Sequence, residues 1–326
     1  MNGVLFLPAA LGVWEIVLIV LGALAFLGIF WLILFGEVLY HILLVRTTKK
    51  KWPRGVSWPK NPDYVKLFNM GKAWREAHLS AIREVTCQSG KLTLHGEYYD
   101  FGSDKCVIIL PGRTESAWYD AAFGEPYEKA GYNVLCPDPR AHGLSDGRYN
   151  TLGFKECRDN IAWAKYLHDE LGQKEIFLHG VCIGSESACF TLAEPDCPEY
   201  ITGMCGEGMF RTFYATFVTH LQEKGHKPFP SGIMGMFFLW LHTGVDVWHD
   251  GPEKRLPLVK KPVLMLHSRE DIYSLPEIAV KLYESIPAEK KQLIWFDTGF
   301  HSMIRSWTEE NREKYDRVIA EFLKDI

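Results

Sequence analysis

The sequence predicts an α/β fold: a mostly parallel eight-stranded sheet with helices on both faces and a helical cap insertion, preceded by one transmembrane helix. From Ala81 onward, short apolar strand-like runs alternate with helix-length stretches. Strands separated in this way form parallel sheets with right-handed crossovers. Two further observations complete the prediction: an uncharged apolar run over residues 16–35, and a strand-to-helix turn over residues 179–184.

Length, charge and cysteine content narrow the possible functions. The 326 residues suffice for one large α/β domain plus an accessory segment. A formal net charge of -4, without a basic stripe in the C-terminal part, argues against a nucleic-acid partner. The cysteines form no C-x-x-C pair and no zinc spacing, and their scatter favours a reducing compartment. No H-E-x-x-H, P-loop or G-x-G-x-x-G is present, so we expect neither a metal nor a cofactor.

Residues 16–35 carry no charge. Twenty residues rising about 1.5 Å each span about 30 Å, which is the thickness of a bilayer core. A cleaved signal peptide would have a basic n-region and a shorter apolar stretch. We therefore interpret residues 1–45 as a transmembrane anchor.

The charges beside this segment predict its orientation. No Lys or Arg precedes it, whereas five basic residues follow closely: Arg46, Lys49, Lys50, Lys51 and Arg54. The positive-inside rule then places the N-terminus outside and the C-terminal domain in the cytoplasm. The same cluster, with Trp52 and Trp58 beside it, also suits anionic lipid headgroups. Both interpretations of the cluster stay open.

After the anchor, residues 46–79 read as a basic, proline-marked linker followed by a short amphipathic helix over 63–79. Residues 80–326 form the predicted globular domain. Its predicted strands are 81–87, 91–98, 106–110, 133–136, 175–178, 201–205, 263–267 and 292–296. Helices are expected near 119–130, 153–171, 184–193, 276–286 and 308–325.

One interval breaks this alternation. More than fifty residues separate the strand ending near Cys205 from the strand starting near Val263, and large apolar side chains are frequent there. An insertion at this place lies above the C-terminal ends of the strands, where ligands bind. We expect a cap over residues 208–258, with Met209, Phe210 and Phe213 lining a substrate pocket. An ordinary helical excursion packed on the core is an equal alternative.

Residues 179–184, HGVCIG, have the G-x-nucleophile-x-G form of a nucleophile elbow. An apolar strand-like run precedes them and small residues follow, which is the strand-to-helix context that the motif requires. The glycines allow a strained turn that exposes the middle side chain. Cys182 stands in this middle place, where serine is usual, so we predict a thiol nucleophile.

Acyl transfer also needs a base and a group to orient it. Asp271 follows the predicted strand 263–267, and His301 follows the strand 292–296. The order nucleophile, acid, histidine is that of hydrolases built on this kind of elbow. A single Asp or His after a strand is more often structural, but three candidates in this order predict the set Cys182, His301 and Asp271.

Oxyanion donors must be backbone N–H groups near the nucleophile. Ile183 follows the nucleophile and supplies one. The second is expected from the loop after strand 106–110, at Arg113, with Thr114 close behind and near the substrate. Two further side chains read as structural or solvated. His142 is expected to tie down the loop in which it lies. Glu207 is expected to be a solvated carboxylate, with a bond to the resting thiol as the alternative.

These motifs resemble the α/β-hydrolase fold family, in particular BEM46-like, serine aminopeptidase-like membrane-anchored hydrolases. The resemblance covers residues 74–305 and runs through IILPGRTES, GYNVLCPDPRAHGLSDGRY, HGVCIGS, KPVLMLHSREDIYSLPE and GFHSM. Family members commonly have His-Gly where this chain has Pro111-Gly112, and serine where it has Cys182. A Gly-x-Cys-x-Gly elbow is similar to the dienelactone-hydrolase pattern.

Cysteine in the elbow changes the expected chemistry. Thiols beside an imidazole or a helix N-terminus ionise readily, so we expect Cys182 to attack as a thiolate. A thiolate leaves more easily than an unprotonated amine, so the sequence predicts cleavage of ester, thioester or lactone bonds rather than peptide bonds. The substrate would be a small molecule or lipid-like. Two alternatives remain: a membrane-tethered binding module without turnover, and an acyltransferase.

Overall fold

The computed structural model describes residues 12–324 and 326. Residues 1–11 of the predicted anchor therefore lie outside the described part. The helices, 3-10 turns included, are α1 Val13–Leu44, α2 Pro62–Ala77, η1 Leu79–Ala81, α3 Ala117–Asp120, η2 Ala121–Phe123, α4 Glu125–Lys129, α5 Glu156–Asp169, α6 Ile183–Ala193, α7 Phe213–Glu223, α8 Ser231–Thr243, α9 Pro252–Arg255, η3 Leu256–Leu258, α10 Pro276–Ser285, α11 Ile304–Trp307 and α12 Glu309–Leu323.

All eight predicted strands are present in one sheet of order β1-β2-β4-β3-β5-β6-β7-β8. They are β1 Ile82–Ser89, β2 Leu92–Tyr99, β3 Lys105–Leu110, β4 Asn133–Pro137, β5 Glu175–Val181, β6 Ile201–Glu207, β7 Val263–Ser268 and β8 Lys291–Phe296. Strands β3 to β8 run parallel, whereas β2 pairs antiparallel with β1 and β4. This confirms the predicted fold class.

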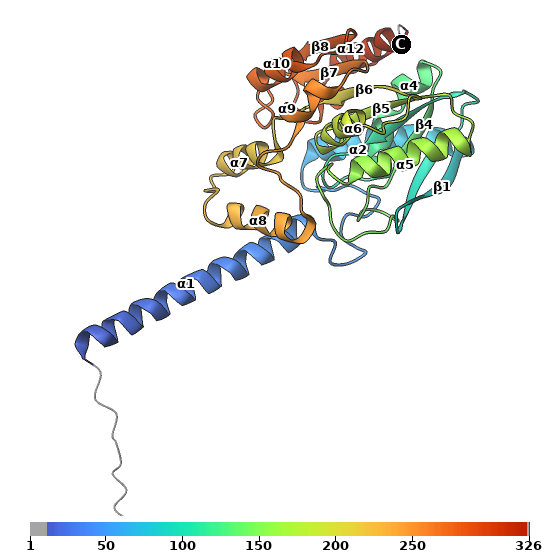
Figure 1. Cartoon of the computed structure of the whole chain (residues 1–326). Helices are drawn as coiled ribbons and strands as arrows, with labels where there is room; N and C mark the ends of the chain where they lie inside the picture. The colour runs from blue at the N-terminus through green and yellow to red at the C-terminus, as the bar shows by residue number, and fades with distance from the viewer. Residues whose placement is uncertain (1–11, 325) are drawn as a thin grey trace, which may run out of the picture.

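Helices cover both faces of the sheet (Figure 1). Side chains of a strand point to alternate faces, and β3 shows the consequence. Val107 and Ile109 belong to the core cluster that includes residues of α2, α4 and α12. Ile108 and Leu110 belong to the other cluster, with residues of α5, α6 and α10. A strand buried on both faces reads as a continuous apolar run, as 106–110 does.

The chain between β6 and β7 contains α7, α8 and α9. Helices α7 and α8 lie between the sheet and the end of α1 (Figure 1). A third core cluster fills this region and joins Tyr40 and Leu44 of α1 to Ile183, Phe213 and Met236. The insertion therefore packs on α1 as well as on the domain.

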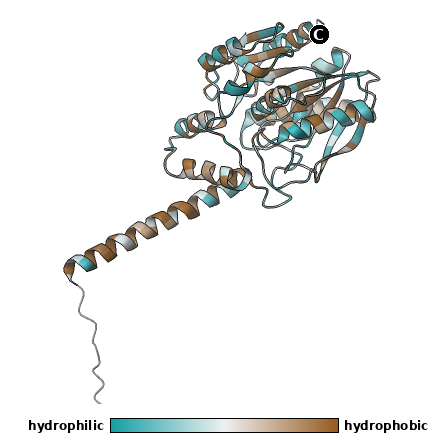
Figure 2. Ribbon diagram, in the orientation of Figure 1, coloured by the Kyte–Doolittle hydropathy of each residue, from teal (hydrophilic) through white to brown (hydrophobic). Residues whose placement is uncertain are grey.

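Helix α1 is longer than the predicted span and continues to Leu44. Its most apolar eighteen-residue window has a mean hydropathy of 2.9 and none of it is buried. Figure 2 shows this helix extending from the domain as a largely hydrophobic rod. Among the described residues, α1 is the one helix long and apolar enough to cross a membrane, although a signal sequence meets the same criteria.

The basic segment after α1 folds back onto the protein. Lys51 Nζ donates to the carbonyl oxygens of His41, Ile42 and Val45, 2.6–2.9 Å away. It thereby satisfies carbonyl groups that a helix end leaves without partners, and its charge suits the negative end of the helix dipole. Arg54 Nε donates to Asp138 Oδ2 at 2.8 Å. Lys51 and Arg54 of the basic cluster are thus already paired with other groups of the protein.

Candidate active site

The strand-to-helix turn predicted at residues 179–184 lies between β5 and α6. Cys182 occupies it with φ 54° and ψ -114°, a conformation that residues other than glycine rarely adopt. The flanking glycines are sterically required, because a Cβ on Gly184 would overlap the Leu110 carbonyl and one on Gly180 would overlap the backbone of Gly184. The backbone contacts of Gly184 with Leu110 and of Gly180 with Gly184 thus hold the half-buried Cys182 side chain at the C-terminal edge of the sheet.

Asp271 and His301 meet beside this turn, from the loops after β7 and β8. Asp271 Oδ2 lies 2.7 Å from His301 Nδ1. The other carboxylate oxygen accepts hydrogen bonds from the backbone N–H groups of Tyr273 and Ser274, at 2.9 and 2.8 Å. Burial alone would raise the pKa of Asp271, but the neighbouring His301 outweighs it and the pKa is lowered. The group is therefore a carboxylate that fixes the orientation of the imidazole.

The other ring nitrogen of His301 is available for chemistry. Nε2 is buried and has no partner of ordinary hydrogen-bond geometry within residues 12–324. Burial disfavours the charged imidazole, but Asp271 and the Cys182 sulfur outweigh it and raise the pKa of His301 well above its ordinary value. An imidazole that holds a proton readily and faces a thiol is suited to general base and acid catalysis.

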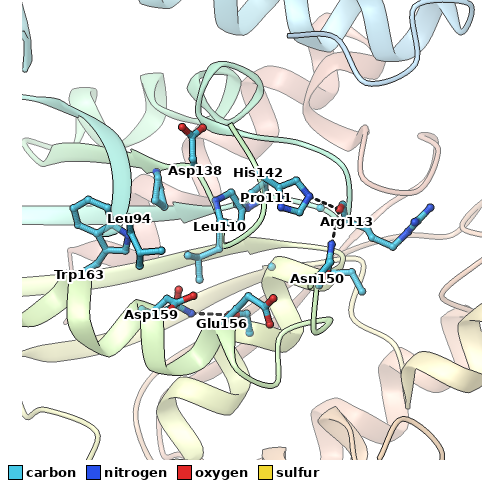
Figure 3. Close-up of a pocket in the computed structure, with 17 residues that line it drawn as sticks. Leu94, Leu110, Pro111, Arg113, Asp138, His142, Asn150, Glu156, Asp159 and Trp163 are labelled. Carbon is cyan, nitrogen blue, oxygen red and sulfur yellow. Dashed lines mark hydrogen bonds between the residues drawn. The ribbon is translucent and has the colours of Figure 1, made fainter. Parts of the chain in front are cut away.

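The predicted oxyanion donors are free. Within residues 12–324, neither the N–H of Ile183 nor that of Arg113 has a backbone or side-chain acceptor. Two side chains hold the backbone of the loop that carries Arg113. His142 Nε2 and Asn150 Nδ2 lie 2.9 and 2.8 Å from the Arg113 carbonyl oxygen (Figure 3). His142 Nδ1 lies 2.9 Å from the Arg140 carbonyl oxygen of its own loop, as expected, so His142 joins the two loops. Two unpaired N–H groups on fixed backbone can stabilise a developing oxyanion.

Arg113, His142 and Asn150 also line a small cavity of about 40 Å³, and the side chain of Arg113 extends away from it (Figure 3). Its Nη1 donates to the carbonyl oxygen of Leu43 in the last turn of α1, at 3.0 Å. The loop of the candidate oxyanion hole is therefore hydrogen-bonded to the end of α1, a contact that sequence spacing does not indicate.

A cavity of about 180 Å³ lies beside the thiol. Its walls include Cys182 and Ile183, Leu43 and Leu44 of α1, Phe213 of α7 and Met236 of α8. Of the four predicted pocket residues, only Phe213 is among them. Met209 and Phe210 are buried in core clusters, and the Thr114 carbonyl accepts a hydrogen bond from Ser57. Apolar side chains in an insertion pack inward as readily as they line a pocket.

The expectation of a solvated Glu207 was wrong. Strand β6 continues to this residue and buries its side chain completely. The carboxylate accepts hydrogen bonds from Tyr315 Oη at 2.8 Å and Ile304 N at 3.2 Å, and burial raises its pKa to about 7. Because Ile304 closely follows His301, Glu207 fixes the start of the helix beyond the histidine loop.

Two further residues were not found from the sequence. Glu115 is 7% exposed, and its carboxylate lies so close to Gly112 that a Cβ on this glycine would overlap it. Burial raises the pKa of Glu115 to about 7, although Arg113 and His301 oppose the shift. Gly208, with φ +65°, lies against the imidazole, since a Cβ there would be 3.0 Å from His301 Cε1.

No described group of three or more His, Cys, Asp or Glu side chains is arranged to hold a metal.

Comparisons with known proteins agree with this architecture. The family model described as alpha/beta hydrolase fold matches residues 105–224. An uncharacterized protein of Bacillus subtilis, YqkD, is 27% identical over 222 residues, which cover 68% of this chain and 71% of the relative. The BEM46-like resemblance itself stays a prediction.

Solved structures give the same result. The Pyrococcus furiosus esterase Pf2001 is similar with a TM-score of 0.64 and 27% identity, over 77% of this chain and 93% of the esterase. A Pyrococcus horikoshii acylaminoacyl peptidase matches with a TM-score of 0.54 and 15% identity, over 74% of this chain and 41% of the peptidase, which indicates the fold alone. Sheet order, family model and structural matches place the chain among proteins of the α/β-hydrolase fold.

Proposed function

We propose that the chain is a membrane-anchored hydrolase that cleaves ester, thioester or lactone bonds through an acyl-enzyme on Cys182. The observation that carries the proposal is the 2.7 Å contact of His301 with Asp271, which leaves Nε2 of the imidazole to interact with Cys182. The esterase Pf2001 among the structural matches supports the same reaction class.

In the acylation step, His301 Nε2 takes the proton of the Cys182 thiol. The thiolate then attacks the acyl carbon, and the N–H groups of Ile183 and Arg113 stabilise the oxyanion. The bond between the acyl carbon and the oxygen or sulfur of the leaving group breaks, and the imidazolium gives its proton to the leaving alcohol or thiol. In deacylation, the imidazole takes a proton from water and the hydroxide attacks the acyl carbon. The bond between this carbon and the Cys182 sulfur then breaks, the acid leaves, and the imidazolium returns its proton to the sulfur.

The leaving group decides which substrates react. A tetrahedral intermediate on sulfur expels an alkoxide or thiolate with assistance from His301, whereas an amine must first be fully protonated. The cavity beside Cys182 contributes apolar surface from Leu43, Phe213 and Met236, which suits an acyl chain.

For the cellular arrangement, we propose that residues 1–45 anchor the chain, that residues 46–79 connect the anchor to the domain, and that residues 80–326 form the catalytic domain with its cap at 208–258. The length and hydropathy of α1 support the anchor. The exposed Lys49 and Lys50 at its C-terminal side favour the cytoplasm for the domain.

Turnover of a graded series of p-nitrophenyl esters and acyl thioesters tests the proposal. We expect hydrolysis by the wild type, loss of at least about 10³-fold with Cys182→Ala or His301→Ala, and no loss with Cys197→Ala, which alters another cysteine that is not fully buried. Absence of turnover by the wild type would contradict the proposal and favour a binding module. Turnover that requires an added alcohol or thiol acceptor would instead favour an acyltransferase.

A further inference from the structure

Helix α8 has an apolar face that the rest of the described chain leaves uncovered. Trp240 is 46% exposed and Leu241 55%, and Phe237 beside them is 39% exposed. On the other side of the same helix, Met236 and Leu239 are fully buried. The exposed apolar side of such a helix is expected to contact another apolar surface.

This helix packs along the end of α1. A Cβ on Gly36 of α1 would clash with Met234 of α8, so the two backbones approach closely. His242 Nε2 lies 3.0 Å from Glu37 Oε1, and its ring stacks on Tyr40 with centroids 4.9 Å apart. Figure 1 shows α8 beside the last turns of α1, and Figure 2 shows that both are hydrophobic. The apolar surface of α1 thus continues onto α8.

The contacts with α1 fix the depth of α8 relative to a bilayer. If residues 16–35 cross the hydrocarbon core, residues 36–40 rise about 1.5 Å each and lie within about 8 Å of its edge. The headgroup layer is about 5–8 Å thick on each side of the core. Helix α8 contacts this part of α1 and therefore lies at the level of the headgroups, where Trp side chains are favoured.

We propose that α8 is an interfacial helix whose exposed face, Phe237, Trp240 and Leu241, rests in the boundary between headgroups and acyl chains, and that the cavity at Cys182 receives acyl chains from this side. The partner of this surface is the lipid bilayer. The inference rests on the proposed anchoring and esterolysis and adds the route by which the substrate reaches the thiol.

The walls of the cavity support this route. Leu43 and Leu44 of α1 and Met236 of α8 line it together with Cys182. The two helices that meet the bilayer are thus also walls of the candidate site. Phe217 and Leu221 of α7 complete this side of the cavity, whose walls are mostly apolar. An acyl chain that reaches the thiol from the membrane side therefore exposes fewer of its methylene groups to water.

Spin labelling of the full chain in phosphatidylcholine nanodiscs tests the position of α8. In a Cys182→Ala, Cys197→Ala background the remaining native cysteines are buried, so a label is introduced with Leu241→Cys, Leu258→Cys or Phe26→Cys. Leu258 is a matched control, 56% exposed and located in η3, which packs on α6 and α10. Phe26, 70% exposed in α1, reports on anchoring.

We expect the labels at 241 and 26 to be more accessible to oxygen than to a water-soluble nickel chelate, and the label at 258 to show the reverse. A water-accessible label at 241 with a lipid-accessible label at 26 would overturn the inference while the anchor stands. Water-accessible labels at both positions would overturn the anchor as well.

A catalytic measurement tests the route. A variant with Trp240→Ser and Leu241→Ser is compared with wild type on p-nitrophenyl palmitate dissolved in the nanodisc and on p-nitrophenyl acetate in water. We expect a loss of at least tenfold on palmitate and less than twofold on acetate, with Leu258→Ser unchanged on both. Equal effects on the two esters would overturn the route, and failure of wild type on both would contradict the proposed hydrolysis instead.

Discussion

His301 Nδ1 and Asp271 Oδ2 lie 2.7 Å apart, and the two residues are only 5% and 3% exposed. In this position the carboxylate is screened little by water, so it holds one ring nitrogen and leaves the other to face Cys182. Both residues come from loops that follow parallel strands at the same edge of the sheet, which is why positions thirty residues apart meet.

Replacement of Asp271 by asparagine tests this orientation. The new amide could keep an acceptor for the N–H groups of Tyr273 and Ser274, so the loop should fold, but it disfavours the imidazole tautomer with a free Nε2 lone pair. For Asp271→Asn we expect kcat to fall about 10³–10⁴-fold with p-nitrophenyl acetate, as for triads in general. A fall below threefold, with unchanged circular dichroism, would show that the pair has no part in turnover.

Substitution of Gly208 tests how tightly His301 is confined. In Gly208→Ala the new methyl group lies against the imidazole, 3.0 Å from Cε1, and must displace it. Gly131→Ala is the matched control, because φ is +81° there and nothing lies within 4 Å of the new Cβ. Both variants should lose about 1–2 kcal/mol of stability from the positive φ. Only Gly208→Ala should lose tenfold or more in kcat, and equal kcat values would contradict the confinement.

The burial of the Glu115 carboxyl group leads us to predict that turnover depends on pH. The group's pKa is raised to about 7 by burial, so the carboxyl is neutral below this pH and charged above it. A carboxylate next to the Gly112–Arg113 backbone repels the oxyanion, and we expect kcat/KM to decline as pH rises through 7. Glu115→Gln should remove the decline, whereas Glu289→Gln, at an exposed site, should leave it unchanged. A pH profile from 5 to 9 that is identical in wild type and Glu115→Gln would contradict the assignment.

The burial of the Glu207 carboxyl group leads us to predict that the stability of the fold depends on pH. The group's folded-state pKa of about 7 is raised above the ordinary value of 4.5 in the unfolded chain. The folded state therefore binds the proton more tightly, and the free energy of unfolding should fall by up to a few kcal/mol as pH rises from about 4.5 to beyond 7. In Glu207→Gln this part of the dependence should disappear from urea titrations at pH 5 and 8. An unchanged difference between the two pH values would show that Glu207 does not titrate in this range.

The sequence was sufficient for the strands and the elbow because both depend on local patterns. Continuous apolar runs identify strands buried on two faces, and glycines around Cys182 identify a turn that tolerates no other residue. Asp271 and His301 were found because parallel strands bring the loops at their C-terminal ends together.

The burial of Glu115 and Glu207 and the partners of Lys51 could not be predicted, for one physical reason. Charged side chains usually lie in water, and their sequence neighbours do not reveal when the fold buries them or supplies distant partners. Tyr315, which hydrogen-bonds Glu207, is 108 positions away in the chain, and the Leu43 carbonyl that receives Arg113 is 70 positions away. The burial of Met209 in the core, away from the cavity, likewise depends on the packing of the insertion.

Detection of the acyl-enzyme is the most direct test of the central claim, that Cys182 is the nucleophile. Wild type is mixed with a p-nitrophenyl ester, quenched with acid during the first turnovers, digested, and analysed by mass spectrometry. We predict an acyl group on the peptide that contains Cys182, formed in a burst with p-nitrophenolate and reduced in His301→Ala. Turnover without an acyl group on Cys182, or with the acyl group on another residue, would contradict the account.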